Sequence, residues 1–258
     1  MLRKCSRRAL FGTLAVLLLG PVAADAQSAS KPAAKQTSTA VAKKARPQLE
    51  PKAIEVLKAV GNRLAGAHTV SVVAVETVES LGSPVSSPVS ANRSEVILQR
   101  PDKLRVLVSG EGTRRSEVYC NGRTMLTYSP DEKALVIAKA PPTINECLTD
   151  AYKACAIDSP FVDLIVPDPH SNGSPPLTRA TFAGQSRVGQ ETTDVVTYSG
   201  RNVSVKMWVG TEDRLPRKLH AAYLDEPNRL RRSVVISDWK IDVPVRPEVF
   251  TQLKTDGR

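Results

Sequence analysis

The feature that most constrains this fold is a succession of short segments in which apolar and polar residues alternate, separated by turn-forming residues. Alternation with a period of two places successive side chains on opposite faces of a β-strand. The clearest segment carries apolar residues at every second position: Val203, Val205, Met207 and Val209. This pattern predicts a sheet with one buried face and one more polar face.

About 11 such strands are predicted, six before residue 140 and about five after residue 177. The first six are Thr69–Val78, Ser94–Gln99, Lys103–Ser109, Ser116–Cys120, Arg123–Tyr128 and Ala134–Ala138. The Asn121-Gly122 pair is a strong hairpin signal, and Ser83–Pro88 is predicted to be a turn or loop. Since helical segments do not alternate with single strands, a parallel α/β sheet is not expected.

Helical patterns occur in two places. After Pro51, apolar residues recur at spacings of three and four, typical of a helix with one apolar face: Ala53, Leu57, Val60, Leu64 and Ala67. His68 is expected at the end of this helix. Thr143 and Glu146 form a capping box for a second helix, and Ser159-Pro160 predicts the start of a short third one. We therefore expect an α+β, β-rich fold: a curved antiparallel sheet forming an open half-barrel, with helices on its concave face.

The first 26 residues have the three parts of a secretory signal. Basic residues precede an apolar run from Ala9 to Leu19, and Ala24-Asp25-Ala26 offers small residues for cleavage. This predicts export to a Gram-negative-type periplasm. The Arg7-Arg8 pair leaves both the general secretory and the twin-arginine routes open. The apolar run is too short for a permanent anchor, which needs ~20 residues, so no transmembrane segment is expected after cleavage.

Residues 27–48 consist mainly of Ala, Ser, Thr, Lys, Pro and Gln, and predict a disordered basic linker before a single domain at 49–258. The first 47 residues hold nine basic residues and one acidic residue, and so account for +8 of the formal net charge of +10. Because phosphate binding needs a concentrated basic surface, the nearly neutral remainder argues against nucleic acid as a partner.

Catalytic and metal-binding motifs are missing from the sequence. It contains no Gly-x-Ser-x-Gly elbow, no phosphate-binding glycine loop and no His-Glu-x-x-His. His68, His170 and His220 have no nucleophile or metal ligand close by in sequence. We therefore predict a protein that is not an enzyme and uses no cofactor and no metal. A hydrolase assembled from dispersed residues is the least favoured alternative.

Three cysteines remain after signal cleavage: Cys120, Cys147 and Cys155. In an oxidising compartment, Cys147 and Cys155 are the nearest candidates for a disulfide. On one straight helix they would lie ~12 Å apart, beyond the ~7 Å that a bridge allows, so the helix would have to break between them. The alternative is that they are buried thiols.

Several short motifs occur in an order that resembles one bacterial family. They are Arg100-Pro101-Asp102-Lys103-Leu104-Arg105-Val106, Asn121-Gly122-Arg123, Ala140-Pro141-Pro142-Thr143-Ile144, Ser159-Pro160-Phe161-Val162-Asp163-Leu164, Leu215-Pro216-Arg217-Lys218-Leu219 and Ser237-Asp238-Trp239. The family comprises predicted periplasmic proteins, catalogued as domain of unknown function 2092, and the similarity covers about residues 50 to 250. The resemblance implies a fold similar to the LolA and LolB lipoprotein carriers, an unclosed β-barrel with an apolar cavity for acyl chains. It implies no catalytic residues.

The apolar faces carry the functional hypothesis. The residues expected to line the concavity and bind a lipid, or an acylated peptide or lipoprotein, are Leu104, Val106, Val108, Val203, Val205, Met207 and Val209. Alternatively, they are ordinary core residues, and the protein is a sensing or interaction module that presents its outer surface to an envelope protein. Trp208 and Trp239 are interpreted either as residues at the rim of the cavity or as core fillers.

Overall fold

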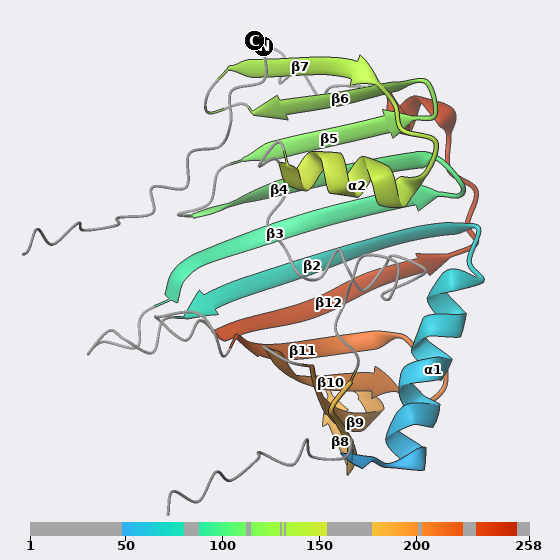
Figure 1. Ribbon diagram of the computed structural model, residues 1–258, viewed down its shortest axis with the longest axis vertical. Coiled ribbons are helices and arrows are strands. Elements are labelled where there is room, and N and C mark those ends of the chain that lie inside the picture. The colour runs from blue at the N-terminus through green and yellow to red at the C-terminus, as the bar shows by residue number, and fades with distance from the viewer. Residues whose placement is uncertain are drawn as a thin grey trace, which may run out of the picture.

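The computed structural model describes residues 48–79, 88–111, 115–129, 131, 133–153, 177–200, 203–223 and 231–251. Twelve strands form one sheet in the order β1-β8-β9-β10-β11-β12-β2-β3-β4-β5-β6-β7 (Figure 1). The strands before α2 are β1 (Gln48–Leu49), β2 (Thr69–Glu79), β3 (Pro88–Gln99), β4 (Lys103–Glu111), β5 (Ser116–Asn121), β6 (Thr124–Ser129) and β7 (Ala134–Lys139). Those after it are β8 (Arg179–Val188), β9 (Glu191–Ser199), β10 (Val203–Gly210), β11 (Pro216–Tyr223) and β12 (Arg231–Ile241). The helices are α1 (Pro51–Ala65), α2 (Ile144–Lys153) and the 3-10 helix η1 (Pro247–Phe250).

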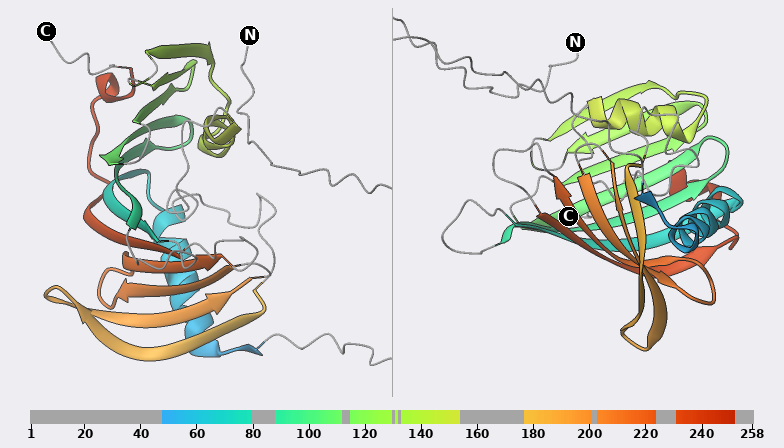
Figure 2. Two further views of the ribbon diagram at one scale, coloured as in Figure 1. Left: turned by 90° about the vertical axis from the view of Figure 1, so that its left-hand side faces the viewer. Right: turned by 60° about the horizontal axis from the view of Figure 1, so that its bottom comes forward.

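The sheet is antiparallel and open. Each neighbouring pair is antiparallel except β1 and β8, which pair in parallel over two residues. The strand order is linear, so β1 and β7 are separate edges. Figure 2 shows the strong curvature, with α1 and α2 on the inner side and η1 on the outer side. The predicted α+β open half-barrel is confirmed, and the two-residue β1 accounts for the difference from about 11 strands.

Two hairpin meanders meet in the middle of the sheet. The first runs from β2 to β7 and the second from β8 to β12. β12 pairs with β2 from Arg231↔Glu79 to Ile241↔Val70, which joins segments more than 150 residues apart in the sequence. The two meanders therefore form one layer with a continuous inner face.

β3 begins at Pro88, six residues before the predicted start at Ser94, because its ladder to β2 continues as far as Pro88. The predicted turn at Ser83–Pro88 falls largely on residues 80–87, which lie outside the described residues, as does the helix predicted after Ser159-Pro160.

The buried face of α1 differs slightly from the prediction. Its buried residues are Ala53, Val56, Val60 and Leu64, while Leu57 is only half-buried. Val56 and Leu57 lie on opposite sides of the apolar stripe of α1. The side that carries Val56 faces the sheet.

Besides Arg63 in its own last turn, the C-terminal end of α1 is bound by a cation from outside the helix. Arg100 donates hydrogen bonds to the carbonyl oxygens of Leu64 and Ala67, each at 3.0 Å, and burial lowers its pKa. His68, expected in this role, is exposed, and its backbone amide donates to Asp242 at 2.7 Å. The turn before β4 therefore ties α1 to the sheet.

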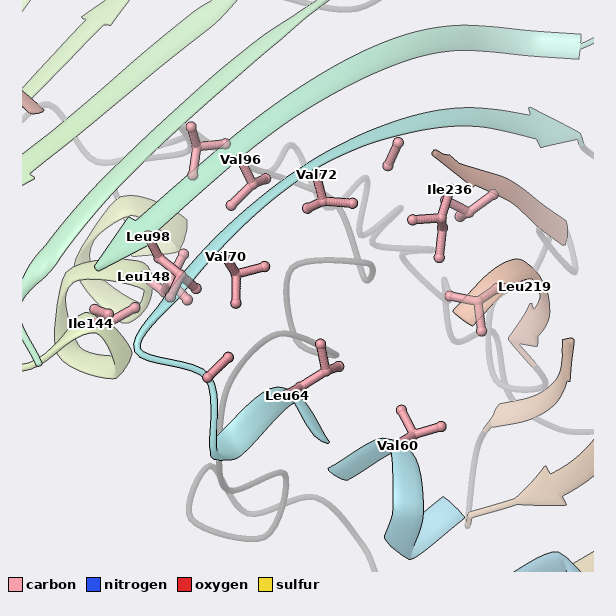
Figure 3. Close-up of a cluster of buried hydrophobic side chains, with 14 of the residues drawn as sticks. Val60, Leu64, Val70, Val72, Val96, Leu98, Ile144, Leu148, Leu219 and Ile236 are labelled. Atoms are coloured by element: carbon pink, nitrogen blue, oxygen red, sulfur yellow. The ribbon is translucent and has the colours of Figure 1, made fainter. Parts of the chain in front are cut away.

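The core lies between the inner face of the sheet and the two helices. Figure 3 shows Val60 and Leu64 of α1 directed toward the strands, with Ile144 and Leu148 of α2 beside Leu98. These residues belong to one cluster that includes side chains from both meanders. The helices and both halves of the sheet therefore share a single hydrophobic core.

Trp239 on β12 packs partly against this core, and its indole Nε1 donates a hydrogen bond to the Pro216 carbonyl at 2.8 Å. We expect Trp239→Phe to lower the free energy of unfolding by about 1 kcal/mol, because the ring is largely retained while the hydrogen bond is lost. Urea denaturation measures this. An unchanged midpoint would contradict the assigned role of the indole N–H.

Candidate functional site: the concave face

All seven residues predicted to line the concavity lie on the inner face of the sheet. Leu104, Val106 and Val108 come from β4, and Val205, Met207 and Val209 from β10; all six are buried, whereas Val203 is half-buried. β11, β12, β2 and β3 separate the two groups. The structure therefore places all seven residues on one face of the sheet, but the β4 group and the β10 group do not lie on neighbouring strands.

The strand register shows how this surface is built. On the first meander, one line of paired residues across four strands is Val72, Val96, Val106 and Val118. On the second, a corresponding line is Val196, Met207 and Leu219, and it continues through Val234 onto β2. Small and β-branched apolar side chains thus cover the inner face across both halves.

The two helices contact different parts of this face. α1 packs against β8 and β9, and α2 against β4 and β5. The strands between these contacts are β10, β11, β12, β2 and β3, and the last three carry inner-face residues such as Ile236, Val72 and Val96 (Figure 3). The apolar surface therefore extends across the strands that separate the two helices.

A buried ion pair interrupts the apolar surface. Glu76 on β2 is 1% exposed, and its carboxylate accepts a hydrogen bond from Nη1 of Arg232 at 3.0 Å. Nδ2 of Asn92 on β3 also donates to Glu76, at 3.4 Å. Opposite charges at this distance largely cancel, so the site is polar but close to neutral. Sequence reasoning missed it, although Glu76 occupies an inward position in the alternation of Thr69–Glu79.

Other polar groups lie on the same part of the face. The Arg232 guanidinium lies 5.7 Å from the centre of the Tyr223 ring, and burial raises the pKa of Tyr198. The buried Asn92 Oδ1 and Ser94 Oγ have no hydrogen-bond partner among the described residues. The inner face is therefore apolar along the first half of β2 and polar near the end of that strand.

The disulfide differs from the prediction. Cys120 at the end of β5 is bonded to Cys147 on α2, with a Cα–Cα distance of 6.8 Å. The expected Cys147–Cys155 pairing is therefore wrong: α2 continues unbroken to Lys153, and Cys155 lies outside the described residues. The bond fixes α2 on the inner face across a separation of 27 residues. Proximity in sequence was misleading because the sheet brings the more distant Cys120 beneath the helix.

Trp208 lies on the convex face, not at the rim of the concavity. The ammonium groups of Lys206 and Lys218 lie 5.0 and 5.3 Å from the centre of its ring. The His220 ring packs edge-to-face with it, with the two ring centres 4.9 Å apart. Burial and the two lysines lower the pKa of His220. Cation–π contacts of this kind stabilise the half-buried indole on this face.

A pocket of about 230 Å³ also lies on the convex face. It is formed where the segment after β12 crosses β2 and β3, between Ser71 and Ile97 on the strands and Val245 and Val249 on the segment. This pocket is separate from the predicted ligand surface.

Within the described ranges, no three His, Cys, Asp or Glu side chains gather in a way that could hold a metal ion. The helices in the same ranges are all too short or too polar to cross a membrane.

Comparison with known proteins yields one family. The profile of the family described as predicted periplasmic protein, domain of unknown function 2092, matches residues 53–258. No match is found among curated proteins.

Solved structures similar to this chain include lipoprotein LppX of Mycobacterium tuberculosis, at 11% identity and a TM-score of 0.44, covering 76% of this chain and 98% of that one. LprF of Mycobacterium bovis is 14% identical with a TM-score of 0.46, covering 78% and 97%. A LolA superfamily protein of Nitrosomonas europaea is 11% identical with a TM-score of 0.35, covering 78% and 97%.

Proposed function

Because this chain belongs to the family of predicted periplasmic proteins, domain of unknown function 2092, we propose that it is a non-enzymatic periplasmic protein that binds a hydrophobic ligand. The ligand is a lipid, or the acyl chain of an acylated peptide or lipoprotein. Residues 1–26 act as its cleaved signal and 27–47 as a linker to the domain, which begins with β1 at Gln48. Supporting this proposal is the apolar inner face, which extends across both meanders while α1 and α2 contact separate parts of it.

The polarity of this face suggests how the ligand is oriented. An acyl chain would lie along the apolar lines of Val72, Val96 and Val106. Because these side chains are buried in the structure, the acyl chain would take the place of the groups that cover them. Its polar group would lie toward Asn92 Oδ1 and Ser94 Oγ, which are buried and have no hydrogen-bond partner among the described residues. Because the Glu76–Arg232 pair is close to neutral, an uncharged polar group fits best.

Burial of apolar area provides sufficient affinity. At ~25 cal/mol per Å², burying about 300 Å² of an acyl chain contributes roughly 7 kcal/mol before the entropy cost of association is subtracted. No bond needs to be made or broken, which agrees with the absence of catalytic motifs in the sequence.

The direct test is native mass spectrometry of protein purified from the periplasm without detergent. We expect co-purified lipid on the wild-type protein. Protein that carries no lipid and takes up none from added phospholipid vesicles would refute the proposal.

A matched pair of variants tests the location of the ligand. Ala221 is a half-buried inner-face residue paired with Val205 and Arg232, whereas Val235 is 48% exposed on the convex face. We expect Ala221→Trp to weaken binding of an anthroyloxy-labelled stearate about tenfold, because the indole would occupy space needed by the acyl chain. Val235→Trp should leave binding unchanged. Equal binding by both variants, in a fluorescence titration of folded protein, would place the ligand elsewhere.

A further inference from the structure

β7 forms one edge of the sheet (Figure 1). It exposes apolar side chains on both of its faces. All six of its residues are exposed, and three consecutive ones are large: Leu135 is 48% exposed, Val136 46% and Ile137 62%. Exposed apolar edge strands are unusual, because proteins generally protect sheet edges with charge, proline or a covering segment. This edge therefore has the character of an interaction surface.

The backbone of β7 is also available for pairing. The Ala140 amide donates to the Arg123 carbonyl at 2.9 Å, in register with the β6–β7 ladder. Because hydrogen-bonded and non-bonded pairs alternate in an antiparallel ladder, the backbone groups of Ala134, Val136 and Ala138 point toward β6. Those of Leu135, Ile137 and Lys139 point outward, where no strand among the described residues pairs with them.

The charged residues at the two ends of β7 indicate which kind of partner would pair with this strand: a second copy of the chain or another protein. Antiparallel pairing with a second copy allows two registers that cover the whole strand. With Val136 facing Val136, Lys139 would face Lys133 at both ends, and with Ile137 facing Ile137, Lys139 would face Leu135. Both lysines are exposed. Asp131, the nearest described acid, is already engaged by the side chain and backbone amide of Arg115. Neither register places an acid opposite Lys133 or Lys139, whereas a segment with acidic flanks would do so.

We propose that β7 is a docking edge for an extended segment of another protein, with an apolar centre and acidic residues at both flanks. The segment adds a thirteenth strand: its backbone pairs with Leu135, Ile137 and Lys139, and its acids face Lys133 and Lys139. This site lies at the edge of the sheet and does not depend on the ligand proposed for the concave face.

A synthetic peptide tests the proposal. The probe is a fluorescein-labelled decapeptide with a central Val-Thr-Val-Thr-Val-Thr run and two aspartates at each end, titrated by fluorescence anisotropy. Ile137→Pro removes an outward-pointing amide that the β6–β7 ladder does not use, and should weaken binding about tenfold or more. Ile137→Thr retains the amide and the β-branch, and should bind within about threefold of wild type.

Charge reversal provides a gain-of-function arm. The double variant Lys133→Glu with Lys139→Glu should bind a lysine-ended version of the peptide more tightly than the aspartate-ended one, reversing the wild-type preference. Equal binding by Ile137→Pro and wild type would overturn the proposal.

Two further measurements identify other occupants. A wild-type dimer in sedimentation that Ile137→Pro dissociates would show that a second copy occupies the edge. Slow deuterium exchange of the amides of Leu135 and Ile137 in isolated wild-type protein would show that another part of this chain covers it. Either result overturns the proposal. Lipid retention measured on the same samples tests the concave face separately.

Discussion

Replacing Cys120 and Cys147 together with alanine will lower the free energy of unfolding by about 3.5 kcal/mol. The bond closes a loop across a sequence separation of 27 residues, and a loop of this length restricts the unfolded chain by about that amount in the chain-entropy description. Both cysteines are fully buried, so alanine also removes some packing between β5 and α2. Urea denaturation under non-reducing conditions measures the loss.

Reductant provides the control for this variant. Wild-type protein should fall to nearly the stability of the double variant when its disulfide is reduced, whereas the double variant should not respond. If reductant destabilises both proteins equally, or neither, the Cys120–Cys147 bond is not the source of the stability. Peptide mapping of the non-reduced protein identifies the cross-linked pair directly.

Arg232→Met will lower the free energy of unfolding by about 3 kcal/mol. It removes the guanidinium that lies 3.0 Å from the carboxylate of Glu76, which is 1% exposed. A buried carboxylate that loses its charged partner is no longer compensated for most of its desolvation cost, although Asn92 still donates a hydrogen bond to Glu76. The lost packing is small, because methionine has a similar stem. Thermal or urea unfolding measures the change.

The double variant Glu76→Leu with Arg232→Met separates charge from packing. It should recover most of the loss, because an apolar pair of similar volume has no uncompensated charge. If the double variant is as unstable as Arg232→Met alone, the destabilisation comes from packing and not from the unpaired carboxylate. A double variant that is stable but no longer retains lipid would indicate that the pair serves binding rather than folding.

Local patterns were sufficient to predict much of the fold. The alternation in β10 and β4 identified inner-face residues correctly, because side chains on a strand have a period of two whatever the tertiary context. The hairpin signal at Asn121-Gly122 is also realised: the Asn121 side-chain oxygen accepts hydrogen bonds from the amides of Arg123 and Thr124, at 2.9 and 2.8 Å. The helix after Pro51 was predicted with one face residue misassigned.

Properties that depend on distant segments were missed. The Cys120–Cys147 bond requires β4 and β5 to lie beneath α2, and the Glu76–Arg232 pair requires β12 to return beside β2. Neither partner lies close to the other in sequence, so spacing carried no signal. The exposed edge at β7 was also missed, because the position of a strand in a sheet depends on which other strands pair with it.

The amino-acid sequence by itself determined the elements: alternating strands joined by tight turns, an amphipathic helix after Pro51 and the apolar set of one sheet face. Periodicity and turn chemistry act within a few residues, so they can be read without knowing the fold. Only the tertiary structure decided the pairing of β2 with β12, the partner of Cys147, the placement of a buried ion pair on the apolar face and the exposure of β7. Each of these features requires contact between segments that are far apart in the sequence. Which distant segments meet depends on the packing of the whole chain.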